Sequence, residues 1–336
     1  MLLACCRPVG VGEDASTREI PARKLPVPAD VSPELAALIA EPLKDSPVPR
    51  TPGEWREMEE ALDTPLAADV RKLAGAVGVT VEETVIAGVR SFVVTPEEIP
   101  AANKERLLMH LHGGGYVFAG GPGGALEAVV VAHATKTKVI SVDYRMPPDH
   151  PFPAALDDAV AVWREVAANH APAKMAIFGT SAGGGLTLAT VHKLKELSMP
   201  LPAALFLGTP AGDITKTGDT WFANAGVDNS IGQYEGIIGE SLKLYAGGAD
   251  MKDPLLSPVY GDFRGFPPAI LVSGTRDLLL SDTVRVHRRM RNAGIPAELH
   301  VFEGQSHADY LRAIESPEAR DVFNEVARFF DKHLGK

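Results

Sequence analysis

The stretch Met175-Ala176-Ile177-Phe178-Gly179-Thr180-Ser181-Ala182-Gly183-Gly184-Gly185 joins an apolar run to a glycine-rich turn, and an amphipathic run up to Leu197 follows at once. A buried strand, a Gly-x-Ser-x-Gly turn and a helix in this order are typical of a nucleophile elbow. Because strand and helix backbones nearly touch in such a turn, it requires glycine at 179 and 183 and leaves Ser181 projecting. The alternative is a phosphate cradle or a capping serine, but the chain has no Gly-Lys-Ser/Thr motif.

On either side of this stretch, short apolar runs alternate with amphipathic ones. The predicted strands are Arg106–Leu111, Lys138–Val142, Met175–Phe178, Ala203–Leu207, Ala269–Ser273 and Ala297–Phe302, and the predicted helices are about Gly124–Ala134, Ala154–Ala168, Gly183–Leu197, Asp282–Ala293 and Pro317–Leu334. Upstream, Thr84–Ala87 and Val89–Val94 are predicted as hairpin strands broken at Gly88. Apolar strands that alternate with helices indicate an α/β fold, with a mainly parallel sheet covered by helices on both faces.

A second glycine-rich motif, His112-Gly113-Gly114-Gly115-Tyr116, directly follows the predicted strand Arg106–Leu111. Glycines after a strand let backbone amides turn toward a ligand oxygen, although such a string is also common in ordinary loops. Acyl transfer needs amide donors of this kind to stabilise the oxyanion of its tetrahedral intermediate. Together with the elbow, the motif favours a hydrolytic site.

Two polar residues complete the order that a serine hydrolase of this sheet type presents, which is serine, acid, then histidine. Asp277 follows the predicted strand Ala269–Ser273, and His307 follows Ala297–Phe302. Open α/β sheets bind ligands beyond the carboxyl ends of their strands, where both residues lie. We expect His307 to accept the Ser181 proton and Asp277 to orient His307. Asp282 is the rival acid, but its place before an apolar-periodic run predicts that it caps the following helix.

The N-terminal part of the chain has a different character. Its first 52 residues hold nine of the 27 prolines. Ser32–Ile39 is predicted as a short helix capped by Ser32, and Thr51 as the cap of a longer amphipathic helix, Pro52 to about Val77. A second irregular stretch, about residues 212–258, interrupts the strand–helix rhythm. It contains the aromatic side chains Trp221, Phe222, Tyr234 and Tyr245, which we expect to close a pocket.

Composition excludes several classes of protein. A net charge of −10 argues against a nucleic-acid binder, and no apolar run is long enough to span a membrane. The two cysteines, Cys5 and Cys6, are adjacent, so we expect neither a disulfide framework nor a cysteine metal site. The stretch Met1–Cys5 faintly resembles the end of a lipoprotein signal but lacks its charged and apolar regions, so we expect a cytoplasmic protein.

Other polar residues are expected to be structural. His110 and His112 share a strand face but have no evident third ligand, so no metal site is predicted. Asp157 and Asp158, and the basic run Arg285–Arg291, are expected on solvated helix faces.

The motifs together resemble one known family. The segments His112–Gly115, Gly179–Gly183, Asp143–Ala155 and Asp253–Pro258, with Asp277 and His307, look like those of the hormone-sensitive-lipase-like (bacterial family IV) esterases, and the resemblance runs from about Pro52 to the C-terminus. Thr180 before the serine is similar to the Gly-Thr-Ser-Ala-Gly subgroup. Met146 to Asp149 departs from the commoner Leu-Ala-Pro-Glu pattern, which we take as neutral.

The resemblance implies an α/β-hydrolase fold with a helical cap. We expect an N-terminal arm with cap helices over residues 1–80 and a catalytic domain over 81–336 with a cap insertion at about 212–258. By resemblance, the amides of Gly114, Gly115 and Ala182 form the oxyanion hole, Gly113 shapes the loop, and His112 anchors it. Members are carboxylesterases that prefer short acyl chains, and many are dimers, so a homodimer is expected.

The sequence therefore predicts a cofactor-free and metal-free serine carboxylesterase that acts on small-molecule esters. The catalytic residues would be Ser181, Asp277 and His307. Lactone or amide hydrolysis uses the same triad and stays open. A small-molecule receptor of the same fold is the non-catalytic alternative, but such receptors have lost the histidine that this chain retains at position 307.

Overall fold

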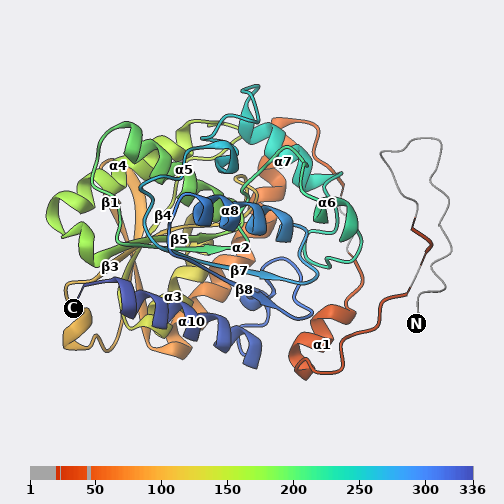
Figure 1. Ribbon diagram of the computed structural model, residues 1–336, viewed down its shortest axis with the longest axis horizontal. Helices are drawn as coiled ribbons and strands as arrows, with labels where there is room; N and C mark the ends of the chain where they lie inside the picture. Colours follow the sequence, from red (N-terminus) through yellow and green to blue (C-terminus); the bar gives the residue numbers. More distant parts are fainter. Residues whose placement is uncertain (1–19, 23, 44–46, 336) are drawn as a thin grey trace, which may run out of the picture.

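The computed structural model describes residues 20–22, 24–43 and 47–335 (Figure 1). Within them, eight strands form one sheet in the order β1-β2-β4-β3-β5-β6-β7-β8. The strands are β1 (Val79–Ile86), β2 (Val89–Pro96), β3 (Leu107–Leu111), β4 (Lys138–Val142), β5 (Met175–Thr180), β6 (Ala204–Gly208), β7 (Ala269–Gly274) and β8 (Ala297–Phe302). β1, β2 and β4 pair antiparallel, and all pairs from β4 to β8 are parallel. The prediction of a mainly parallel sheet is confirmed.

Helices cover both faces of the sheet because its strands are apolar on both sides (Figure 1). The helices α4 (Ala154–Asn169), α5 (Ala182–Glu196) and α8 (Leu280–Asn292) pack on one face, in a core that includes Leu107 and Met109. The helices α3 (Leu126–Thr135) and α10 (Pro317–His333) pack on the other, in a core that includes Leu108. Successive residues of β3 therefore serve opposite cores.

The N-terminal helices form as the capping signals predict. Ser32 caps α1 (Pro33–Ala40), and Thr51 caps α2 (Pro52–Val77) by accepting from the Glu54 amide at 3.2 Å. The buried residues Val70 and Ala74 of α2 join the core shared with α3 and α10. The arm thus packs on the body of the molecule, although the domain boundary at residue 80 stays a prediction.

The β1–β2 hairpin is longer than predicted. Its pairing extends from Ile86 opposite Val89 back to Val79 opposite Pro96, whereas the sequence suggested a start at Thr84. The turn lies at Ala87 and Gly88, both with positive φ, as expected from the glycine. The earlier residues were missed because β1 alternates exposed and half-buried side chains, which weakens its apolar signal.

The stretch between β6 and β7 holds two helices, α6 (Thr220–Ala223) and α7 (Ile237–Ala246). It includes the stretch at about 212–258, whose role as a cap insertion stays a prediction. In Figure 1 it lies at one end of the sheet, beyond the carboxyl ends of the strands. Its residues therefore lie where open α/β sheets bind ligands.

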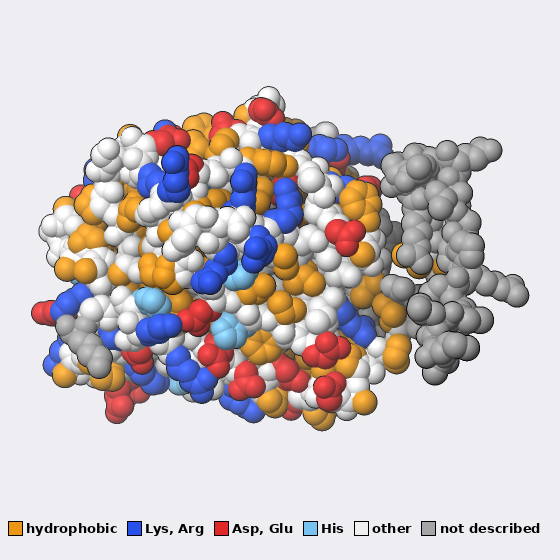
Figure 2. All heavy atoms as spheres, viewed as in Figure 1, with side chains coloured by type: hydrophobic (Ala, Val, Ile, Leu, Met, Phe, Trp, Pro, Cys, Tyr) orange, Lys and Arg blue, Asp and Glu red, His pale blue; other side chains and the backbone are white. Residues whose placement is uncertain are grey.

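The expected solvated helix faces are correct only in part. In Figure 2, Lys and Arg side chains gather in the middle of the visible face, where Figure 1 places α8, and Arg288, Arg289 and Arg291 are exposed. The prediction for Asp158 was wrong. Asp157 is exposed, but Asp158 is buried and accepts a two-pronged ion pair from Arg145. Asp157 and Asp158 are neighbours on α4 and point in different directions, so one faces the solvent while the other packs inward.

Some expectations concern residues that the structure does not describe. The residues Met1–Cys6, with both cysteines and the signal-like start, lie outside the described residues. In the described part, no helix is both long and apolar enough to cross a membrane, and no three His, Asp or Glu side chains gather to hold a metal ion. The cytoplasmic location and the homodimer stay predictions.

Candidate active site

The elbow has the geometry that its glycines imply. β5 ends at Thr180, Ser181 adopts φ 61° and ψ −124°, and α5 begins at Ala182. A Cβ atom on Gly179 would lie 2.2 Å from the carbonyl oxygen of Leu111, and one on Gly183 only 1.9 Å from that same oxygen. No side chain fits at either position. The strained serine is held by its own amide, which donates to Gly208 O at 2.8 Å.

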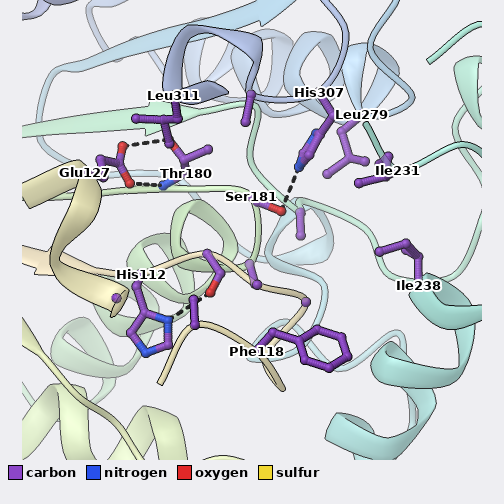
Figure 3. A pocket seen from close by; sticks show the side chains of 18 of the residues that line it. His112, Phe118, Glu127, Thr180, Ser181, Ile231, Ile238, Leu279, His307 and Leu311 are labelled. Carbon is purple, nitrogen blue, oxygen red and sulfur yellow. Dashed lines mark hydrogen bonds between the residues drawn. The ribbon is translucent and has the colours of Figure 1, made fainter. Parts of the chain in front are cut away.

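The structure brings Ser181, His307 and Asp277 into one hydrogen-bonded chain. Ser181 Oγ lies 2.8 Å from His307 Nε2 (Figure 3). His307 Nδ1 lies 3.0 Å from Asp277 Oδ1. Asp277 lies in the loop after β7 and His307 in the loop after β8, as the sequence predicts. When Nδ1 donates to the carboxylate, Nε2 is free to accept the serine proton.

Asp277 is held by more partners than the sequence revealed. Its Oδ2 accepts from Ser273 Oγ at 2.7 Å and from Thr209 Oγ1, and its Oδ1 also accepts from the Leu279 amide at 2.8 Å. Burial opposes ionisation, but His307 and these donors outweigh it and hold the pKa of Asp277 below its usual value. Asp277 is therefore an anion at neutral pH. Thr209, which donates to Asp277, has φ 33°, a rare conformation for a β-branched residue.

The predicted role of Asp282 was wrong. α8 begins at Leu280, so Asp282 lies inside its first turn and caps nothing. Its Oδ2 accepts from the Asp213 amide at 3.3 Å, and Arg285 lies 3.6 Å from its Oδ1. Burial and the nearby charge of Asp213 raise the pKa of Asp282 well above its usual value. The helix starts earlier because the turn Asp277 to Leu280 leads straight into it.

His307 is buried, and its pKa is set by opposing effects. Burial disfavours the imidazolium, but the charge of Asp277, its hydrogen bond to His307 and the charges of Asp228 and Asp309 outweigh burial. The pKa of His307 is therefore raised above its ordinary value. An imidazolium formed by proton transfer from Ser181 is favoured in this setting.

The glycine loop after β3 passes directly beside the elbow. A Cβ on Gly113 would lie 3.0 Å from Thr180 O and 3.4 Å from Ser181 Cβ. Gly114 and Gly115 both have positive φ, and a Cβ on Gly114 would lie 2.2 Å from Phe118 O. The loop can approach Ser181 in this form only with glycines. It brings the two predicted oxyanion residues of the loop next to the elbow, where Ala182 begins α5.

His112 anchors this loop. Its ring stacks on Tyr144 with centroids 4.0 Å apart, and Nδ1 donates to Gly113 O at 2.8 Å. Burial lowers the pKa of His112 to about 4, so the ring is neutral at pH 7. The far end of the loop is held by Asp63 of α2, which accepts from the amides of Ala119 at 2.7 Å and Gly120 at 2.9 Å. Sequence reasoning missed Asp63 because its partners lie 56 and 57 residues away.

Beneath the elbow lies a buried polar cluster that the sequence did not reveal. Thr180 donates from its amide at 3.1 Å and from its hydroxyl at 2.6 Å to Glu127 of α3 (Figure 3). Glu127 also accepts from His110 Nε2 at 3.1 Å, and Tyr310 OH lies 2.8 Å from Thr180 Oγ1. The threonine before Ser181 thus ties the elbow to α3. This also accounts for His110 without a metal.

Ser181 opens into an apolar pocket of about 280 Å³. Figure 3 shows Phe118, Ile231, Ile238 and Leu279 around the serine. Besides these, the lining includes the apolar side chains Leu66, Leu126, Ile214, Trp221, Leu242 and Leu311. The pocket is therefore suited to a small apolar group next to a reacting carbonyl.

Of the four aromatic residues expected to close the pocket, only Trp221 lines it, so the expectation was wrong for the other three. Trp221 lines the pocket, but Phe222 is 61% exposed and does not line it. Tyr245 is buried in a stack on Tyr116 with ring centroids 3.9 Å apart, and it does not reach the pocket. Tyr234 packs edge-on against Trp221 and supports it from outside the lining.

Comparison with known proteins agrees with this geometry. Residues 108–311 match the family described as alpha/beta hydrolase fold. An acetyl-hydrolase of Streptomyces hygroscopicus is 28% identical over 244 residues, which are 70% of this chain and 79% of that protein.

Solved structures give the same result. The crystal structure of an esterase, E25, is similar with a TM-score of 0.92 and 42% identity over 95% of this chain and 100% of that one. An esterase from the bacterial hormone-sensitive lipase family is similar with a TM-score of 0.78 and 29% identity over 90% of this chain and 99% of that one. All three similar proteins bear the names of ester hydrolases.

Proposed function

Because the chain belongs to the hormone-sensitive-lipase-like esterases of the α/β-hydrolase fold, and is an ester-hydrolysing enzyme, we propose that it cleaves short-chain carboxylic esters through Ser181, His307 and Asp277. The observation that carries this proposal is the hydrogen-bonded chain from Ser181 to His307 to Asp277, with distances of 2.8 and 3.0 Å. It lies at the wall of an apolar pocket. We also propose that the enzyme belongs to the Gly-Thr-Ser-Ala-Gly subgroup, which the presence of Thr180 before Ser181 supports.

In the first half of the proposed reaction, Ser181 Oγ attacks the ester carbonyl and its proton passes to His307 Nε2. Asp277 holds the ring with Nδ1–H toward the carboxylate and stabilises the imidazolium. The carbonyl oxygen becomes an oxyanion, which the amides of Gly114, Gly115 and Ala182 would bind. Each such donor contributes about 3 kcal/mol to the stabilisation of the transition state.

The intermediate then expels the alcohol, which takes the proton from His307 Nε2, and an acyl-serine ester remains. Water attacks that ester with His307 again as base, and the acid leaves with Ser181 restored. Every proton in this cycle moves between Ser181, His307, water and the substrate. The residues named supply each step without a metal ion or a cofactor.

The preference for short chains is supported by the pocket. Its volume of about 280 Å³ is at the low end for small-molecule sites. Trp221 and Leu242 come from the insertion, and Leu66 comes from the arm, so both regions close the pocket around Ser181. A long acyl chain would need these side chains to move.

A receptor of the same fold is the non-catalytic alternative. The short contact between Ser181 and His307 favours hydrolysis, because a receptor has no need for a base on its serine. Lactone and amide hydrolysis would use the same residues, and a substrate panel separates them from ester hydrolysis.

The test is a panel of p-nitrophenyl esters with acyl chains of two to sixteen carbons, together with a lactone and an anilide. We expect the highest kcat/KM at about two to six carbons. Ser181→Ala should lower kcat about 10⁴-fold or more with the melting temperature preserved. Ser91→Ala is the matched control, because Ser91 is also a buried serine but lies on β2, away from the pocket.

The proposal fails if Ser181→Ala keeps more than about a tenth of the wild-type kcat. A kcat/KM that rises steadily to sixteen carbons would contradict the short-chain preference alone. Faster turnover of the lactone or the anilide than of any ester would reassign the substrate class.

A further inference from the structure

The insertion between β6 and β7 contains a buried carboxylate that the proposed reaction does not use. Asp228 has no solvent-exposed surface. Its Oδ1 accepts from the amides of Ser230 at 2.9 Å and Ile231 at 3.2 Å. Its Oδ2 accepts from the amides of Leu278 at 2.9 Å and His307 at 3.2 Å. One side chain therefore satisfies four backbone donors from three separate segments.

These donors lie at the centre of the proposed chemistry. Leu278 directly follows Asp277, and the second bonded amide belongs to His307 itself. Because one oxygen accepts from both, Asp228 fixes the separation of the loop after β7 from the loop after β8. On its other side it holds Ile231, which lines the pocket. The same carboxylate thus connects the acid, the base and a wall of the pocket.

Neighbouring bonds of the insertion reinforce this arrangement. Asn224 donates to the carbonyl of Asp277 at 2.9 Å, and Thr220 donates to the carbonyl of Leu278 at 2.7 Å. The amide of Asn229 donates to Ser306 Oγ at 3.2 Å, one residue before His307. The insertion therefore braces both loops through their backbones, and Asp228 is the only charged member of these contacts.

The charges around Asp228 matter because its carboxylate contributes to the raised pKa of His307. The titratable groups that face it and His307 are Asp277 and Asp309, and Arg312 pairs with Asp309 at 2.9 Å. No Lys or Arg of the described residues forms a salt bridge with Asp228. Burial and the charge of Asp277 raise the pKa of Asp228 to about 6, while His307 acts in the opposite direction.

We propose that Asp228 is a positioning residue of the hydrolytic site, which holds the Asp277 and His307 loops in register and supports the His307 imidazolium through its negative charge. The inference rests on the proposed function. Asp228 does not touch the reacting atoms, because its contact with His307 is through the backbone amide. It acts on proton transfer through the geometry and the charge of the two residues that it connects.

The test compares Asp228→Asn with the wild type. The substitution keeps the size of the side chain but removes the charge, and it turns an amide group toward two of the four N–H donors. We expect kcat to fall about tenfold or more, with KM changed less than about threefold. Since a negative charge near His307 is lost, the acid limb of the kcat/KM profile should move to lower pH by about half a unit or more.

Asp158→Asn is the matched control. Asp158 is also a buried carboxylate, but its partner is Arg145, and neither residue lines the pocket at Ser181. Its loss should lower the melting temperature and leave the acid limb where it is. A carboxylate with a merely structural role would behave in that way, so the position of the acid limb distinguishes the two roles.

The pH titration of the His307 ring by NMR separates this inference from the proposed function. If wild type hydrolyses no compound of the panel, the proposed function fails, and a lowered His307 pKa in Asp228→Asn still supports the charge effect. An unmoved His307 pKa together with kcat within twofold of wild type overturns the inference. Asp228→Ser, smaller and neutral, serves if Asp228→Asn does not fold. If neither folds, Asp228 is a structural residue only and the inference is wrong.

Discussion

On each side of Ser181, one aspartate holds the neighbouring loops by accepting their backbone amides, but the charged groups around the two aspartates differ. On one side, Asp228 accepts backbone amides and faces His307 and Asp277. On the other, Asp63 of α2 accepts the amides of Ala119 and Gly120, at the end of the loop that carries Gly114 and Gly115. Asp63 is only half buried, and none of the proposed triad residues contributes to its pKa.

The difference separates two jobs that the proposed mechanism combines. In that mechanism the Asp277 and His307 side moves protons, so a change there should alter both the rate and its dependence on pH. The glycine-loop side would bind a developing negative charge with uncharged amides, so a change there should alter the rate alone. Substitutions on the two sides can therefore be distinguished by their pH profiles as well as by their size.

The largest effect is expected for Asp277→Asn, which breaks the proton-transfer side. The variant keeps the shape of the side chain but favours the wrong tautomer of His307, so kcat should fall about 10⁴-fold. The melting temperature should change little, because the remaining oxygen still accepts from Ser273 and Thr209, and only the Leu279 amide loses its acceptor. Steady-state kinetics with p-nitrophenyl acetate measures the effect. A loss of less than about tenfold would mean that Asp277 is not the acid.

A smaller effect is expected for Asp63→Ala, which loosens the glycine-loop side. Two charge-assisted hydrogen bonds to the loop are lost, and Phe118, whose amide donates to Gly114 O at 2.8 Å, is less well fixed. We expect kcat/KM to fall about tenfold while the acid limb stays at the wild-type pH. Asp69→Ala, on the exposed side of the same helix, is the control. A displaced acid limb would show that the two sides are not electrically separate.

The smallest effect on activity is expected for Asp282→Asn, because Asp282 lies in the first turn of α8 and does not line the pocket. The pKa of Asp282 is raised in the folded protein. Between its unfolded and folded pKa values the folded state binds more protons, so this group makes the free energy of unfolding fall as pH rises. Because asparagine does not ionise, the variant lacks this decrease in the free energy of unfolding. The variant should keep kcat within twofold and should melt about 2 °C or more above wild type at pH 8, with the gain shrinking toward pH 5.

Thermal denaturation at the two pH values checks this prediction. A melting temperature several degrees below wild type at pH 8 would show instead that the Arg285 contact at 3.6 Å stabilises the charged form. Loss of turnover would make Asp282 part of the active site.

The sequence was sufficient wherever a local pattern determines the geometry. The spacing of Gly179 and Gly183 predicts the elbow because backbone atoms about 2 Å from a missing Cβ exclude every other residue. Strand ends predict the meeting of Asp277 and His307 because parallel strands point the same way. Thr51 and Pro52 mark the start of α2 because capping is local.

The sequence was insufficient where a residue acts over distance. Asp228 reaches Leu278 and His307 from 50 and 79 residues away, in a stretch with no regular period. Asp282 was predicted to be a helix cap because an apolar-periodic run follows it. The turn that begins at Asp277 instead makes the helix start at Leu280. Asp158 looked exposed because charge in a helix suggests solvent, and its partner Arg145 lies outside that helix.

The separation of the site residues along the chain also affects how the enzyme is made. Ser181 and His307 are 126 residues apart, so β8 and its loop leave the ribosome after the elbow. At about 5–20 residues per second, the nucleophile is synthesised roughly 6–25 seconds before its base. Until then Asp228 has no His307 amide to bind, and the two loops that it joins are free of each other. Under the proposed mechanism, a nascent chain that has formed its elbow therefore carries an unactivated serine, and hydrolysis begins only when synthesis has passed β8.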